Sequence, residues 1–280
     1  MEIWQAIVLG LTQGASEYAP ISSSGHLILV PWAFDWPQLG GDAGFAKSFD
    51  VALHMGTLFG ALIYFRRDVA RYLRAFIGTL GRRRVRTTDE RIAWALVVGT
   101  LPGVIAGFTF EDLIQNNLGE PVLIAIMLAV FGVVLWWVDR RSRRDRPFES
   151  IGPLTGLFLG TAQALALQPG VSRSGITMTA ARAIGLDRAS AARFSFLLSM
   201  PIIAGAGAYK AIGLIDTGLL GYGPQFFWGF ASSAASGFLV VWGLLAYLKR
   251  HDYSVFMWYR LLAAMVVLGL IATGVREATI

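Results

Sequence analysis

Six stretches of this sequence are candidates for membrane-crossing helices, which need about 17 to 25 predominantly apolar residues. Three of them contain no ionisable side chain, at 92–110, 121–138 and 226–248, and three weaker ones lie at 49–65, 194–209 and 261–275. Only 15% of the residues are charged and the mean hydropathy is +0.57, which does not fit a water-soluble domain. We therefore predict an all-α polytopic integral membrane protein.

Arginine is distributed unevenly between the segments that connect these stretches. Nine arginines fall within 66–91 and five within 139–149, whereas 111–120 has three acidic residues and no basic one. Basic residues in short loops stay on the cytoplasmic side. The pattern places 66–91, 139–149 and 249–250 inside, and 34–47, 111–120, 210–225 and the C-terminus outside. We interpret the net charge of +6 as a signal of orientation and expect no nucleic-acid partner.

Two further apolar segments, 3–34 and 151–181, are interrupted by prolines and polar residues. Glu17, Pro20 and His26 interrupt the first, and Pro169 and Arg173 interrupt the second. A broken helix is tolerated at membrane depth only where its backbone is buried in protein or lines a wet cavity. We predict that both segments are re-entrant helical hairpins, the first entering from the outer face and the second from the cytoplasmic face.

The two interrupted segments repeat each other at a constant offset of 150 residues. The paired positions are Gly10 and Gly160, Gln13 and Gln163, Ser22 and Ser172, Ser24 and Ser174, and Gly25 and Gly175. Each half, 1–148 and 149–280, then has one hairpin and three spans, so the second half is an inverted repeat of the first. Such halves form one membrane domain and bring two broken helices face to face near the midplane.

Ionisable residues at membrane depth are costly and usually functional, which singles out Glu17, His26 and Arg173. Helices that start after serine-rich breaks offer hydroxyl and free N–H groups to an anion, and Arg173 adds a guanidinium suited to phosphate. With a carboxylate and an imidazole beside them, these groups indicate phosphoryl transfer. The chain has no cysteine, which excludes thiol chemistry. The other candidate site residues are Gln13, Ser22, Ser23, Ser24, Gly25, Ser172, Ser174, Gly175 and Thr177.

Plainer interpretations exist for parts of this pattern. Serine-rich breaks in membrane helices often only allow close packing. His54, four residues after Asp50, is interpreted as half of a satisfied polar pair. Broken helices at the midplane are also the architecture of secondary transporters, so an anion carrier with the same site is the alternative function. His26 beside Glu17 favours an enzyme, because a carrier needs no nucleophile.

Two motifs resemble those of the undecaprenyl-diphosphate phosphatases, also called bacitracin-resistance proteins. Gln13 to Glu17 is similar to their (E/Q)-x-x-x-E motif, and Ser22 to His26 is similar to the S-S-x-G-H that follows it. Pro169 to Thr177 is similar to P-G-x-S-R-S-x-x-T at every specified position. The resemblance extends over essentially the whole chain. Position 13 is glutamine where many members carry glutamate, which lowers the local carboxylate count.

The resemblance implies a membrane enzyme that hydrolyses undecaprenyl diphosphate to the monophosphate and so recycles the lipid carrier for peptidoglycan and other envelope polymers. For the carrier alternative it implies a polyprenyl-phosphate flippase that uses the same midplane site. It implies that His26 is the nucleophile or acid–base group, that Glu17 activates it or holds a metal ion, and that Arg173 binds diphosphate with Ser172, Ser174 and Thr177. Mg²⁺ or Ca²⁺ is the implied cofactor. Ser23 is the rival nucleophile; we favour His26, because imidazole is nucleophilic near neutral pH whereas a serine hydroxyl needs a base.

The expected partners are the polyprenyl diphosphate and membrane lipids, and the sequence leaves the oligomeric state open, a homodimer included. The resemblance implies a bacterial inner membrane. The loop charges predict a site open to the extracytoplasmic face, where the spent diphosphate carrier appears.

Overall fold

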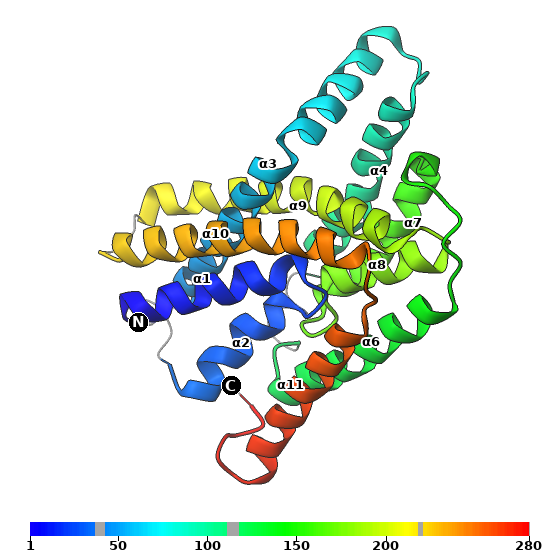
Figure 1. The fold of residues 1–280 in the computed structure, drawn as a ribbon. Helices are drawn as coiled ribbons and strands as arrows, with labels where there is room; N and C mark the ends of the chain where they lie inside the picture. Colours follow the sequence, from blue (N-terminus) through cyan, green and yellow to red (C-terminus); the bar gives the residue numbers. More distant parts are fainter. Residues whose placement is uncertain (37–42, 111–117, 218–220, 280) are drawn as a thin grey trace.

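The computed structural model describes residues 1–36, 43–110, 118–217 and 221–279. These residues form helices and turns, and they contain no strand (Figure 1). Six of the described helices are long and apolar enough to cross a membrane. They are α3 (Ala43–Arg82), α4 (Thr88–Thr109), α6 (Pro121–Arg141), α9 (Arg188–Thr217), α10 (Gly223–Leu248) and α11 (Ser254–Ala272). The predicted all-α, multi-pass membrane protein is confirmed, with a helix at each of the six predicted spans.

Each predicted broken segment consists of two shorter helices. α1 (Ile3–Tyr18) and α2 (Ser23–Phe34) form the first. In the second, a 3-10 turn, η2 (Phe148–Ser150), precedes α7 (Pro153–Ala164), and another, η3 (Leu165–Leu167), separates α7 from α8 (Arg173–Ala183). Pro20 and Pro169 lie in the two breaks, where a proline removes a backbone donor and disfavours helical geometry at the residue before it. α1 and α7 end before these prolines, at Tyr18 and Ala164.

Glycines allow the broken segments to pack closely on long helices. A Cβ atom at Gly10 of α1 would lie 2.4 Å from the carbonyl oxygen of Gly229 in α10, and one at Gly160 of α7 would lie 1.9 Å from that of Gly99 in α4. Small residues permit this approach of helix backbones in membrane proteins. Figure 1 shows α1 lying along α10. Two glycines that the sequence pairs thus make the same kind of contact.

The end of α1 is fixed by the apolar core around α9. Phe194, Phe196 and Leu198 of α9 are fully buried in this core. Tyr18, the last residue of α1, packs edge-to-face on Phe196 with 5.0 Å between ring centroids. Its hydroxyl donates a hydrogen bond to the Thr57 carbonyl oxygen at 3.2 Å. These contacts hold the residue next to Glu17 in place.

Two charged segments differ from the predicted loops. α3 continues to Arg82, so most of the arginines between 66 and 91 lie on a helix that extends with α4 from the rest of the molecule (Figure 1). A capping box between Thr87 and Glu90 starts α4 directly after a short turn. Asp139, predicted in a loop, is buried near the end of α6. The predicted outer loops 34–47, 111–120 and 210–225 lie partly outside the described residues.

Candidate active site

Both helix breaks end at a serine with an unusual backbone conformation. Ser22 has φ 76° and ψ 91°, and Ser172 has φ 74° and ψ 113°. A positive φ costs a residue other than glycine about 1–3 kcal/mol, and such residues cluster at functional sites. The Oγ of Ser22 accepts a hydrogen bond from the Gly25 N–H, and the Oγ of Ser172 accepts one from the Gly175 N–H. The two breaks therefore present the N-termini of α2 and α8 in the same way.

Two hydrogen bonds hold the breaks against each other. The Gly170 N–H donates to the Ser22 Oγ at 2.9 Å, and the Ser174 Oγ donates to the Ala19 carbonyl oxygen at 3.0 Å. All four groups are buried. As a result, the start of α8 lies next to the end of α1, and motif residues far apart in the sequence form one site.

Glu17 is the centre of a buried polar cluster at this junction. The Ser23 Oγ donates a hydrogen bond to its Oε2 at 2.5 Å, and the Gln13 Nε2 donates to the same oxygen at 2.9 Å. Arg173 forms an ion pair with Oε1, and the Nε2 of His54 lies 3.5 Å from Oε2. A carboxylate that accepts a hydrogen bond from a serine hydroxyl is placed to take its proton when the oxygen attacks.

The cluster faces a cavity of about 290 Å³. The Nη1 of Arg173 and both polar atoms of the Gln163 amide are buried without a hydrogen-bond partner among the described residues. Buried polar groups are normally paired, since an unpaired one costs about 1–3 kcal/mol. An anion with several oxygen atoms fits the two donors among these groups, the Arg173 Nη1 and the Gln163 Nε2. The polar lining consists of Glu17, Ser23, Ser24, His54, Gln163, Ser172 and Arg173.

His26, the nucleophile favoured from the sequence, does not line this cavity. Its Nδ1 lies 2.7 Å from the Ser22 carbonyl oxygen and its Nε2 lies 2.7 Å from the Tyr259 hydroxyl. The ring also stacks on Tyr259, with 5.6 Å between centroids and 17° between planes. Both nitrogen atoms are thus engaged, and the Nε2 contact joins α2 to α11. The geometry favours Ser23 over His26 as the group that attacks.

His54, and not His26, is the histidine that lies beside the Glu17 carboxylate. Its Nδ1 contacts the backbone carbonyl oxygen of Asp50 at 2.8 Å, and its Nε2 is directed to Glu17. The interpretation of His54 as one half of a self-contained pair with Asp50 was therefore incomplete. The rule that singled out His26, an ionisable group within an apolar span, applied equally to His54.

Arg260 is a second residue that the sequence analysis missed. Its guanidinium, fully buried, donates to the Leu128 carbonyl oxygen at 2.9 Å, the Pro20 oxygen at 3.2 Å, and the Gly170 and Val171 oxygens at 2.6 and 3.1 Å. It thereby links both helix breaks to α6. The predicted span 261–275 excluded this residue, whereas α11 begins at Ser254 and carries it inside the helix.

The remaining predicted residues support the breaks without lining the cavity. The Thr177 Oγ1 donates to the Arg173 carbonyl oxygen at 2.8 Å. No group of three histidine, aspartate or glutamate side chains that could hold a metal ion occurs in the part of the chain that the structure describes. Beside Glu17, however, the Gln13 Oε1 is buried without a partner. These two oxygen donors fit a Mg²⁺ or Ca²⁺ ion that takes most of its ligands from phosphate groups.

Comparison with known proteins agrees with these motifs. Residues 6–266 match the family model described as bacitracin resistance protein BacA. An undecaprenyl-diphosphatase of Thermomicrobium roseum is 44% identical over 277 residues, which cover 96% of this chain and 98% of the relative. An undecaprenyl-diphosphatase of Moorella thermoacetica is 46% identical over 268 residues (95% and 97%), and that of Geobacter sulfurreducens is 45% identical over 271 residues (96% and 98%).

Proposed function

This chain belongs to the bacitracin resistance protein BacA family, and we propose that it is an undecaprenyl-diphosphatase, which hydrolyses undecaprenyl diphosphate to undecaprenyl phosphate and inorganic phosphate. The names of its relatives support this activity. The observation that carries it in the structure is the Ser23 hydroxyl, which donates to Glu17 inside a cavity that Arg173 also lines. The carrier alternative gains no support, because binding alone gives no reason for a hydroxyl paired with a carboxylate.

In the proposed reaction the Ser23 Oγ attacks the terminal phosphorus of the diphosphate while its proton passes to the Oε2 of Glu17. An Oγ–P bond forms, the anhydride P–O bond breaks, and undecaprenyl phosphate leaves with the proton from Glu17. Water then attacks the phosphoserine, gives a proton through Glu17 to the Ser23 Oγ and releases inorganic phosphate. The free Nη1 of Arg173 stabilises charge on the phosphoryl oxygens, where such a donor acts most strongly.

The other candidate residues take supporting roles in this proposal. Ser24, Ser172 and Gln163 line the cavity, where they would contact the phosphate groups. Ser22, Gly25, Ser174, Gly175 and Thr177 hold the two breaks in shape, and His26 fastens α2 to Tyr259. A Mg²⁺ or Ca²⁺ ion held by Glu17 and the Gln13 Oε1 would neutralise part of the diphosphate charge.

The test compares two adjacent serines that line the same cavity, of which Ser23 bonds to Glu17. Inorganic phosphate released from undecaprenyl diphosphate is measured with purified protein in detergent. Loss of a nucleophile costs roughly 10⁴-fold or more in kcat, so Ser23→Ala is expected to abolish turnover. Ser24→Ala is expected to stay within about tenfold of wild type, since it removes one of several phosphate contacts.

Three results would contradict the proposal. Folded wild-type protein that binds the lipid but releases no phosphate would exclude the enzyme. Equal losses in Ser23→Ala and Ser24→Ala would exclude Ser23 as the attacking group. Turnover that survives Ser23→Ala but disappears in His26→Gln would return the nucleophile to His26.

We further propose that the halves 1–148 and 149–280 are inverted repeats within one membrane domain, each with a re-entrant hairpin followed by three spans. Ser22 and Ser172 share one backbone conformation. Gly10 of α1 packs on α10 in the same way that Gly160 of α7 packs on α4. These similarities support a common ancestor for the two segments and the inverted arrangement that their odd number of spans requires.

The proposed location is the bacterial inner membrane, with the site open to the extracytoplasmic face. Support comes from the arginines that gather on the α3–α4 turn and after α6, where positive charge favours the cytoplasm. The substrate and the membrane lipids are the expected partners. A homodimer stays a prediction.

A further inference from the structure

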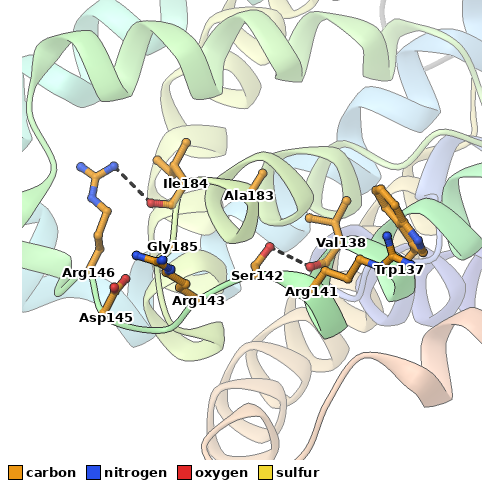
Figure 2. Close-up of a pocket in the computed structure, with 10 residues that line it drawn as sticks. All are labelled: Trp137, Val138, Arg141, Ser142, Arg143, Asp145, Arg146, Ala183, Ile184 and Gly185. Carbon is orange, nitrogen blue, oxygen red and sulfur yellow. Dashed lines mark hydrogen bonds between the residues drawn. The ribbon is translucent and has the colours of Figure 1, made fainter.

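A second cavity of about 750 Å³ lies at the end of α6 and α8, apart from the site around Glu17 (Figure 2). Its lining combines the guanidinium groups of Arg141, Arg143 and Arg146 with Trp137 and the apolar Ile184. α8 connects the two cavities: its first residue lines the first, and Ala183 lines the second. At 1.5 Å per residue, the 11 residues of α8 separate them by roughly 16 Å.

A buried ion network gives this cavity a fixed wall. The fully buried Arg182 donates to the Asp139 Oδ1 at 2.7 Å, and Arg188 donates to both carboxylate oxygens of Asp139. Arg182 also donates to the backbone carbonyl oxygens of Ser142 and Arg143, at 3.3 and 2.9 Å. The backbone after α6 is therefore held in place while the Arg143 side chain stays exposed.

Positive charge exceeds negative charge in the lining. The lining contains one carboxylate, that of Asp145, and three arginines. The Nη1 of Arg146 donates to the Ile184 carbonyl oxygen at 3.3 Å, where a cation balances the C-terminal end of the α8 dipole. Within the described part of the chain, Arg141 and Arg143 form no ion pair. Their guanidinium groups are available to an anion from outside the protein.

The position of the cavity points to a lipid as the source of that anion. α6 is an apolar span that carries Trp136 and Trp137 in its last two turns, and the guanidinium of Arg141 lies 4.7 Å from the centre of the Trp137 ring. Tryptophan and arginine at the end of a span mark the headgroup level of a membrane. Trp137 is 49% exposed, so an acyl chain can reach the apolar edge of the cavity.

We propose that this cavity binds the phosphate headgroup of an anionic phospholipid, with Arg141 and Arg143 on the phosphate and Trp137 against the start of the acyl chains. Basic pockets between membrane helices at headgroup depth recognise such lipids. The proposal does not depend on the reaction at Ser23. A bound lipid here would join α6 to the end of the helix that carries Arg173.

The test is a thermal-unfolding titration of the purified full chain with phosphatidylglycerol in detergent micelles. The double variant Arg141→Gln/Arg143→Gln is compared with Arg144→Gln, a neighbouring exposed arginine that does not line the cavity. Each basic residue near an anionic lipid strengthens binding, and the loss of two is expected to weaken the phosphatidylglycerol affinity about 30-fold. The Arg144→Gln variant is expected to bind phosphatidylglycerol like the wild type. Phosphatidylcholine and soluble glycerol phosphate are expected to give no shift.

Other outcomes overturn the proposal. An equal phosphatidylglycerol affinity in wild type and double variant would show that the arginines do not bind the lipid. An equal shift with phosphatidylcholine would remove the need for an anion, and one with glycerol phosphate would identify a site for free phosphate. Phosphate release is measured in parallel: if the double variant keeps it, a weaker lipid affinity reports on the cavity and not on unfolding.

Discussion

Replacement of Glu17 by glutamine should remove most of the turnover and leave the protein folded. Glutamine keeps the side-chain volume and one carbonyl oxygen, but it removes the carboxylate charge. The Oε2 of that carboxylate lies 2.5 Å from the Ser23 Oγ and accepts its proton in the proposed reaction. General-base catalysis contributes roughly 10²- to 10⁴-fold, which corresponds to about 3–5 kcal/mol in the activation free energy. We therefore expect kcat to fall by that factor, with a smaller change in KM because Arg173 still binds phosphate.

The same substitution also breaks an ion pair, which sets the expected change in stability. Removal of one partner of a buried pair costs about 3–5 kcal/mol. The Arg173 side chain is 18% exposed and lines the cavity, so its charge is less isolated than that of a fully buried arginine. We expect the free energy of unfolding to fall by about 3 kcal/mol, the lower limit for such pairs.

The assay measures kcat and KM for undecaprenyl diphosphate in detergent, with thermal unfolding of the same preparation. Glu17→Asp is the matched control, because it keeps the carboxylate and moves it by one methylene group. Its kcat should lie between those of wild type and Glu17→Gln. A folded Glu17→Gln protein with kcat within threefold of wild type would refute the role of Glu17 as the base.

Three further predictions concern the frame of the site, the metal ion and the orientation. Arg260→Met is expected to lower the free energy of unfolding by about 3–5 kcal/mol, because it leaves several buried carbonyl oxygens unpaired. The control is Arg276→Met, which breaks a partly exposed ion pair with Asp35 and should cost less than about 1 kcal/mol. Equal losses in the two variants, measured by thermal unfolding, would contradict the structural role of Arg260. Removal of divalent cations with a chelator is expected to stop phosphate release without unfolding the protein, and addition of Mg²⁺ should restore it; full activity in chelator would exclude a metal ion from the reaction. With cysteines introduced singly at Arg84 and Glu120, an impermeant thiol reagent is expected to label intact cells at position 120 and not at position 84, and the reverse would invert the proposed topology.

The parts of the fold that were predictable depend on patterns within a short stretch of sequence. Apolar runs gave the six spans, because a span has to be apolar along its whole length. Pro20 and Pro169 gave the two breaks, because a proline disrupts a helix at its own position. Charge runs were less reliable guides to loops: the arginines after residue 65 continue α3, because a helix leaving the membrane can carry charges on all sides.

The site could be predicted as a set of motifs but not as a geometry. Glu17, Ser23 and Arg173 were each identified and lie together, whereas the choice between Ser23 and His26 required the side-chain directions. Intrinsic nucleophilicity favoured imidazole, yet the ring of His26 is held by the Ser22 carbonyl and Tyr259. The histidine beside Glu17 is His54 of α3. No local sequence pattern predicts that α3 packs against α1 at this point.

The proposed repeat would explain how two related breaks supply different chemical groups to one site. Ser23 and Arg173 occupy equivalent positions, each the first residue of the helix that follows a strained serine. One side offers a hydroxyl and the other a guanidinium, and both lie next to Glu17, which has Leu167 as its counterpart. A site made of two identical halves would place like groups on both sides of the phosphate. The proposed reaction uses a nucleophile with its base on one side of the phosphate and a cation for the developing charge on the other. We infer that divergence at the 23/173 and 17/167 positions turned a symmetric anion site into a hydrolytic one.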